Sequence, residues 1–194
     1  MKLCSMVMAL VFTAAATVVP TRVSATIPTP IPSVTSVPTI APPVPNTGKK
    51  QEYILPYPGL LSDHPLYFLK TLRDAILDRL IVDPLRRAEF YLLQADKRLS
   101  MGLFLQEKGK GALAGAAVGE GEIFMEKMVT SLGSFRETGK DVPRSIVDRV
   151  NRALEKHTEV IVGMAGKADG QEKQKLLVSL ELVKKLEGEV GKLP

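Results

Sequence analysis

Histidines are the first residues to consider as catalysts or metal ligands, because imidazole titrates near neutral pH, and this chain of 194 residues has two. His157 lies on the apolar face of a stretch with helical periodicity. The residues three and four positions away carry no metal-binding atoms: Ala153, Leu154, Val160 and Ile161. We therefore expect a buried or boundary histidine bonded to the backbone or to a nearby side chain. His64 precedes Pro65 and is expected at a helix cap. A catalytic or metal-binding site assembled from residues that are distant in the sequence stays open at this point.

Acidic and glycine-rich motifs give no stronger signal for chemistry. Di-iron bundles need Glu-x-x-His on two helices, and the chain contains no such tetrapeptide. Glu120 and Glu122 lie in a glycine-rich stretch, where one of them could face a cavity. The run GKGALAG at 109–115 lacks both the dinucleotide-binding glycine spacing and the Lys-Ser/Thr of a phosphate loop. We predict a protein that is not an enzyme, with no catalytic, cofactor-binding or metal-binding residues and no cofactor.

The stretch LPYPGLLSDHPLYFLKTLRD at 55–74 concentrates prolines, a glycine and tyrosines before a helical pattern begins. In a structural interpretation, the prolines keep the chain extended, Gly59 turns it, and Tyr53, Tyr57 and two leucines close one end of a helical bundle. In the alternative, four residues form a recognition surface. These residues are Tyr57, Asp63, His64 and Tyr67.

The N-terminus has the pattern of a secretory signal peptide at 1–25. Lys2 precedes an apolar run at 3–19, and small residues end at Ala25. The run is shorter than the about 20 residues of a comfortable membrane span. We therefore expect cleavage and an extracytoplasmic location (secreted, periplasmic or at the cell surface), the alternative being an uncleaved membrane anchor. Cleavage also removes the single cysteine, Cys4, and lowers the net charge from +5 to +3, which argues against nucleic-acid binding.

The composition changes twice along the remaining chain. Residues 26–48 are rich in proline, threonine and serine, which is typical of a semi-rigid linker and of a stalk that could carry O-glycosylation. Residues 49–194 read as one helical domain, in which a C-terminal hairpin occupies about 141–191.

Apolar residues in that domain recur every three or four positions and predict helices at about 65–82, 84–108, 111–138, 143–165 and 171–190. The first carries Leu69, Leu72, Ile76 and Leu80. The second has small residues on its seam, including Ala95 and Gly102, which would let a neighbouring helix approach closely. No stretch reads as a strand. We predict an all-α fold, an antiparallel bundle of four to five helices in which short connections make sequential helices neighbours.

Three of these helices are expected to begin with an aspartate near a proline, because a carboxylate caps free N–H groups and proline suits the first helical turn. The aspartates are Asp63, Asp83 and Asp141.

Residues 55–108 resemble an uncharacterised family of exported helical domains. The family's pattern Pro-Gly-x-Leu-x-Asp-x-Pro-x-Tyr-x-Leu-Lys runs here from Pro58 to Lys70. Its second pattern, Asp-Pro-x-(Lys/Arg)-(Lys/Arg)-Ala-Glu, matches DPLRRAE from Asp83. Here that segment holds Arg86 and Arg87 directly before Ala88 and Glu89, and the Leu-x-x-Ala-x-x-Arg-Leu helix follows at 92–99. Ser62 departs from the family's usual proline. The family-like part is about 53–136. The resemblance implies an exported helical module and carries no known catalytic residues.

These observations leave three hypotheses for function. The first is a non-enzymatic interaction or structural module of the cell envelope, which binds an unknown protein or envelope component and contacts a membrane only if the signal is an uncleaved anchor. The second is a periplasmic chaperone or stress sensor for apolar clients, with an adaptable surface at Phe124, Met125, Met128 and Phe135. The third is a helical bundle that holds a metal or small ligand.

Overall fold

The computed structural model describes residues 52–193, so the predicted signal peptide and linker lie outside the described residues. Five α-helices follow one another: α1 (Tyr67–Leu80), α2 (Pro84–Glu107), α3 (Gly111–Glu137), α4 (Arg144–Ala165) and α5 (Gly170–Val190). No strand occurs in this part of the chain. The all-α prediction is confirmed, and the helix boundaries agree with the expected ones to within two residues.

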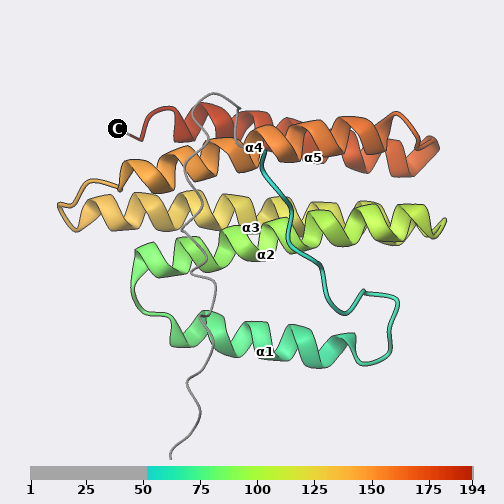
Figure 1. Ribbon diagram of the computed structural model, residues 1–194, viewed down its shortest axis with the longest axis horizontal. Coiled ribbons are helices and arrows are strands. Elements are labelled where there is room, and N and C mark those ends of the chain that lie inside the picture. Colours follow the sequence, from blue (N-terminus) through green and yellow to red (C-terminus); the bar gives the residue numbers. More distant parts are fainter. Residues whose placement is uncertain (1–51, 194) are drawn as a thin grey trace, which may run out of the picture. The chain divides into compact units, whose positions relative to one another are not determined.

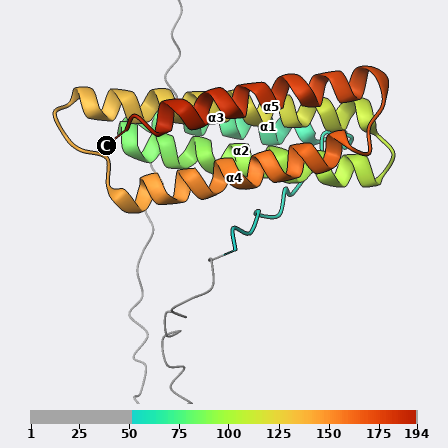
Figure 2. The ribbon, with the colours of Figure 1, turned by 90° about the horizontal axis from the view of Figure 1, so that it is seen from above.

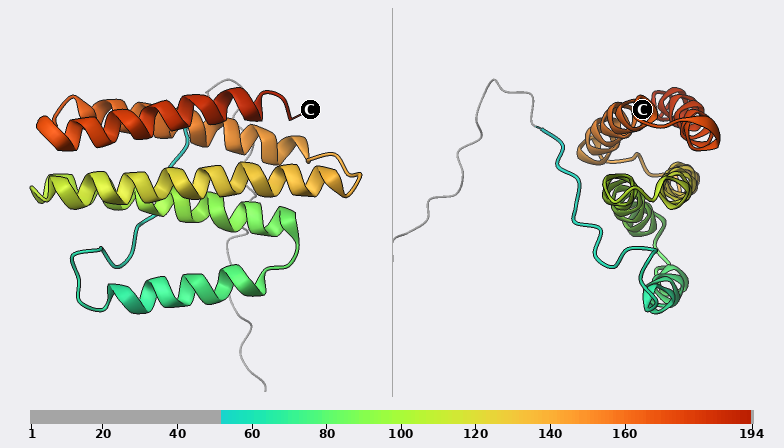
Figure 3. Two further views of the ribbon diagram at one scale, coloured as in Figure 1. Left: turned by 180° about the vertical axis from the view of Figure 1, so that it is seen from behind. Right: turned by 90° about the vertical axis from the view of Figure 1, so that its right-hand side faces the viewer.

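Helices α2 to α5 form an antiparallel four-helix bundle (Figure 1). Helix α2 packs most extensively on α3, α4 packs on α5, and contacts of α3 with α5 and of α2 with α4 join the two pairs. The end-on view in Figure 3 shows these pairs as two layers. The consecutive helices α3 and α4 therefore lie diagonally, and the expectation that all sequential helices are neighbours is wrong at this connection.

Helix α1 is not a fifth member of this bundle. It is absent from the closely packed helix pairs of the described chain and lies outside the α2/α3 layer (Figures 1 and 3). Seen from above, it lies behind the bundle helices (Figure 2). Side chains connect it to α2 instead: the Tyr91 hydroxyl donates a hydrogen bond to Asp78, and the Arg87 guanidinium donates two to the carbonyl oxygen of Ile81 at 2.6 and 2.9 Å. This indirect attachment leaves much of α1 in contact with solvent.

The contact between α2 and α3 depends on glycine. A Cβ atom at Gly102 of α2 would lie 2.6 Å from Cγ2 of Val118 on α3, and one at Gly121 would lie 3.2 Å from the carbonyl oxygen of Ala95. Carbon atoms at optimal separation are about 3.5–4.0 Å apart, so the helices approach this closely only because these side chains are absent. The predicted small-residue seam is therefore confirmed.

The core of the bundle consists mainly of leucine, methionine, valine, isoleucine and alanine side chains from all four helices, together with Tyr91 and Phe135. Its largest fully buried side chains include Leu99, Met125, Leu154 and Leu176, one from each helix. Residues 49–194 form one compact unit that contains this whole core. We therefore expect residues 49–194 to fold as an independent domain.

One of the three expected aspartate caps forms. The Asp83 carboxylate accepts a hydrogen bond from the Arg86 N–H at 2.9 Å, and Pro84 occupies the first turn of α2. Asp63 instead contacts lysines, and Asp141 precedes an α4 N-terminus at Pro143 that has no side-chain cap. An aspartate near a proline was therefore a better guide to where a helix starts than to which atoms cap it.

Candidate functional site

The segment 52–66 crosses the bundle obliquely, from the level of α4 past α2 to the start of α1, and does not close one end of the bundle (Figure 1). Tyr53 bonds Asp96 in the middle of α2, while Tyr57 packs edge-on against Phe104 further along, with ring centroids 5.9 Å apart. Gly59 has a φ of 70°, which confirms the expected turn. Helix α1 then returns antiparallel to α2.

The four residues predicted as a recognition surface have separate contacts. The Tyr57 residue is 75% exposed, and the His64 ring accepts a hydrogen bond through Nδ1 from the Leu66 N–H at 3.1 Å, which supports its expected role at a helix start. The Asp63 carboxylate accepts a hydrogen bond from Lys110 at 2.8 Å, which holds the pKa of Asp63 below its usual value.

Tyr67, the fourth of these residues, is half-buried beneath Arg98 of α2. The Arg98 guanidinium lies 5.3 Å from the Tyr67 ring centroid and 5.8 Å from that of Phe124 on α3. Burial lowers the pKa of Arg98, and Glu120 at 3.4 Å opposes that effect. Cation–π contact of this kind fixes the start of α1 to the α2/α3 layer. Each of the four residues therefore has contacts of its own, and their joint role as a recognition surface stays a prediction.

The bundle interior holds an ionic cluster that the sequence did not reveal, made of Tyr53, Asp96, Glu122 and His157. His157 of α4 is fully buried, with Nδ1 2.7 Å from Oε1 of Glu122 on α3 and Nε2 3.2 Å from Oδ1 of Asp96 on α2. The Tyr53 hydroxyl donates to the other Asp96 oxygen at 2.6 Å. We call this set the His157 cluster. It joins three helices and the N-terminal segment.

The geometry of the His157 cluster favours a protonated imidazole. Both ring nitrogens face carboxylate oxygens, and only the imidazolium form can donate at both positions. Burial opposes the charge, but the carboxylates of Glu122 and Asp96 outweigh it and raise the pKa of His157 to about 9. The pKa of Tyr53 is also raised, by burial and by the charge of Asp96. The cluster therefore holds a buried positive charge between two acidic side chains.

The expectation of a buried, bonded His157 is confirmed, and Glu122 is the glycine-stretch glutamate that faces inward. A signal for this was available, since a fully apolar helix face seldom includes a histidine without a partner. The partners themselves were not predictable, because Asp96 and Glu122 are 61 and 35 residues away from it. Within residues 52–193, no group of three or more His, Cys, Asp and Glu side chains is arranged to hold a metal ion.

The second unusual feature is the outward side of α1. Eight large apolar residues there and at its ends are exposed: Leu66, Phe68, Leu69, Leu72, Ile76, Leu77, Leu80 and Val82. On the opposite side of α1, Asp74 is buried and Asp78 accepts a hydrogen bond from Tyr91. Lys70 donates hydrogen bonds to the carbonyl oxygens of Pro58 and Leu60. We call Leu69, Leu72, Ile76 and Leu80 the α1 outer face. Helix α1 thus turns its polar side to the protein and its apolar side to solvent.

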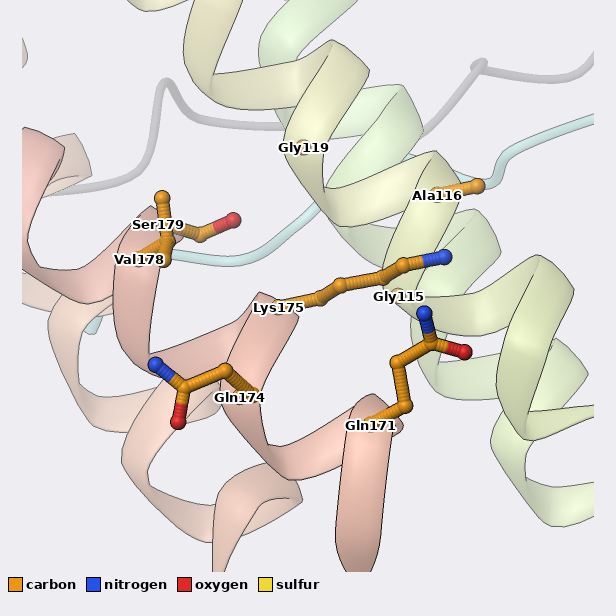
Figure 4. A pocket seen from close by; sticks show the side chains of 8 residues that line it. All are labelled: Gly115, Ala116, Gly119, Gln171, Gln174, Lys175, Val178 and Ser179. Carbon is orange, nitrogen blue, oxygen red and sulfur yellow. The ribbon is translucent and has the colours of Figure 1, made fainter.

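A hollow of about 440 Å³ lies between α3 and α5 (Figure 4). Glycines form its α3 wall, and the aliphatic part of Lys175 lies over Gly115, with Cβ 3.6 Å from the position a Gly115 side chain would take. Its glutamines and Lys175 are exposed. A hollow with open walls and exposed polar side chains does not make a defined binding site, and we assign no function to it.

These features define an all-α protein, a four-helix bundle with an internal ionic cluster and an additional N-terminal helix that exposes an apolar face. No helix in the described part of the chain has the length and apolarity to cross a membrane. The chain matches no protein-family model, no curated protein and no solved structure. The resemblance of residues 55–108 to an exported helical family therefore stays a prediction.

Proposed function

We propose that this protein is a non-enzymatic, exported interaction or structural module of the cell envelope, and that the α1 outer face is its interaction surface. The expected export rests on the N-terminal sequence pattern. The choice of surface rests on the orientation of α1, which is the single observation that carries the proposal.

An apolar helix face in water is costly, since each fully exposed leucine or isoleucine forgoes about 1.5–3 kcal/mol of burial energy. The chain had an alternative, because rotating α1 about its axis would have placed the same residues against α2. Instead, inward contacts of Asp78, Lys70 and Tyr67 hold α1 in the exposed orientation. Exposed apolar patches of this kind are typical of interaction sites.

The chaperone alternative receives less support. Met125 and Met128 are fully buried, and Phe135 is also part of the core. Phe124 packs against it and lies under Arg98. The surface that this hypothesis assigned to these residues is therefore interior, so an apolar client would have to bind α1 instead.

The interaction proposal is tested by sedimenting the purified 49–194 unit with isolated envelopes of the host. The informative variant is Leu72→Gln/Ile76→Gln, which removes two half-exposed residues from the α1 outer face. The matched control is Val162→Gln/Val178→Gln, two residues of similar exposure on α4 and α5. We expect the first variant to lose envelope binding and the control to keep it.

If both double variants bind envelopes equally well, α1 is not the interaction surface. If the wild-type unit does not bind envelopes at all, the proposed function is wrong. Export is tested separately by N-terminal sequencing of the protein recovered from host envelopes, where we expect the chain to begin after Ala25.

A further inference from the structure

We propose that the α1 outer face binds an anionic lipid surface, with α1 lying in the membrane–water interface. This inference rests on the proposed function and names its partner. The membrane contact would be independent of any N-terminal anchor, because every residue involved lies within residues 66–82.

The acidic residues of α1 face the protein, whereas two of its three basic residues are exposed. The helix has five charged residues, of which Lys70, Asp74 and Asp78 face the protein. The remaining two, Arg73 and Arg79, are exposed. At 3.6 residues per turn they lie about 60° to either side of Ile76, so one arginine borders each edge of the α1 outer face.

This arrangement matches an anionic bilayer. Interfacial helices bury an apolar face among the acyl chains and keep basic residues at the headgroups, where long arginine side chains reach the phosphates. Arg73 keeps 58% of its side chain exposed while it bonds the buried Asp74 at 2.6 Å. Asp83, just beyond α1, is engaged in capping α2. The outward side of α1 therefore combines apolar residues with positive charge.

A second copy of the chain fits this face less well. In a symmetric dimer through α1, either helix orientation brings an arginine edge opposite an arginine edge, while Asp74 and Asp78 stay on the far side. The area is also small. A 14-residue helix is ~21 Å long, so one face buries on the order of 400 Å², about half of the ~800 Å² per partner of a standard interface. A lipid surface needs neither a complementary shape nor a complementary acidic side chain.

The test is vesicle flotation of the 49–194 unit. Vesicles of phosphatidylcholine with phosphatidylglycerol are compared with vesicles of phosphatidylcholine alone, at low and high salt. We expect binding to the anionic vesicles that weakens with salt. Leu72→Gln/Ile76→Gln should lower the partition coefficient by on the order of tenfold or more. Arg79→Gln should lower it about fivefold.

The matched controls are Val162→Gln/Val178→Gln for the apolar change and Arg144→Gln, at the exposed start of α4, for the charge change. Both should bind as the wild type does. Circular dichroism of each variant verifies that the bundle is intact, since all substituted residues are exposed.

Five outcomes would overturn the lipid proposal. Equal binding to both vesicle types removes the role of charge. If the protein binds envelopes through α1 but does not bind vesicles, the interaction module stands and lipid is excluded as its partner. If it binds neither envelopes nor vesicles, the proposed function ends as well. A dimer in light scattering that Leu72→Gln/Ile76→Gln dissociates assigns the face to a second copy. If residues 49–194 bind vesicles but residues 26–194 do not, the occupant of the α1 outer face is the linker at 26–48.

Discussion

The His157 cluster makes the stability of the bundle depend on pH. In the folded protein the pKa of His157 is raised to about 9, from 6.5 for an ordinary histidine. The folded state therefore binds the proton more tightly than the unfolded state. Protonation contributes its full stabilisation below about pH 6.5, and that contribution is lost as the pH rises through 9. The shift corresponds to about 3 kcal/mol, a large part of the 5–15 kcal/mol that stabilises a typical domain.

The measurement is urea denaturation of the 49–194 unit, followed by circular dichroism from pH 6 to pH 10. We expect the free energy of unfolding to fall across this range. His64→Gln is the control, because His64 is the other histidine of the chain and is exposed. Because His64→Gln leaves His157 in place, the free energy of unfolding of this variant should still fall as the pH rises. The 49–194 unit lacks Cys4, so no cysteine titrates in this pH range.

His157→Gln should remove the pH dependence and lower the free energy of unfolding by about 3–5 kcal/mol at pH 6, since it leaves two buried carboxylates without the positive charge between them. Glu122→Gln removes one of these carboxylates, so the fall should begin at lower pH. If either variant does not fold, the ring Cε1–H resonance of His157 in the wild-type unit reports its titration directly. A titration midpoint at or below pH 6.5, or a wild-type stability that is flat from pH 6.5 to 9, would refute the reasoning.

Two further substitutions test packing and hydrogen bonding by denaturation. Gly102→Ala should destabilise the bundle by about 1–3 kcal/mol, because the new methyl group would lie 2.6 Å from Val118, whereas Gly133→Ala, with no atom within 4 Å, should be neutral or stabilising. Tyr53→Phe should cost about 1.5–3 kcal/mol, because Asp96 loses the hydroxyl donor, while Tyr57→Phe at an exposed ring should change stability by less than about 0.5 kcal/mol. Equal effects within either pair would contradict the structure.

The helices were predictable because their signals are local. Apolar spacing is repeated within each helix, and the breaks are marked by residues such as Pro84 and Gly109, which has a φ of 70° in the turn before α3. The close approach of α2 and α3 was also predictable, since Gly102 continues a seam with a fixed period. The diagonal placement of α3 and α4 was not, because a short connection limits distance but does not choose between two neighbouring positions.

The His157 cluster was hidden for a related reason. A histidine on an apolar face indicates that a polar partner exists, but the partner can come from any helix that borders the same interior. Here the partners are Asp96 and Glu122. The glycine-rich stretch indicated that Glu120 or Glu122 could face inward but not which residue it would meet, and Asp96 is one of many acidic residues at helical spacing. Only the packing of α2 and α3, brought together at Gly102 and Gly121, places both carboxylates at the level of His157.

The periodicity of the sequence cannot predict which way the apolar face of α1 points. A stripe at Leu69, Leu72, Ile76 and Leu80 has the same spacing whether it faces a core, a partner or a membrane. What decides the orientation is the opposite side of the helix, where Asp78 reaches Tyr91. If these inward contacts hold the apolar side outward, the free energy of that exposure has to be recovered elsewhere. The proposed anionic lipid surface would recover it through the residues that the bundle leaves uncovered, and the two exposed arginines border that face, where the phosphates would lie.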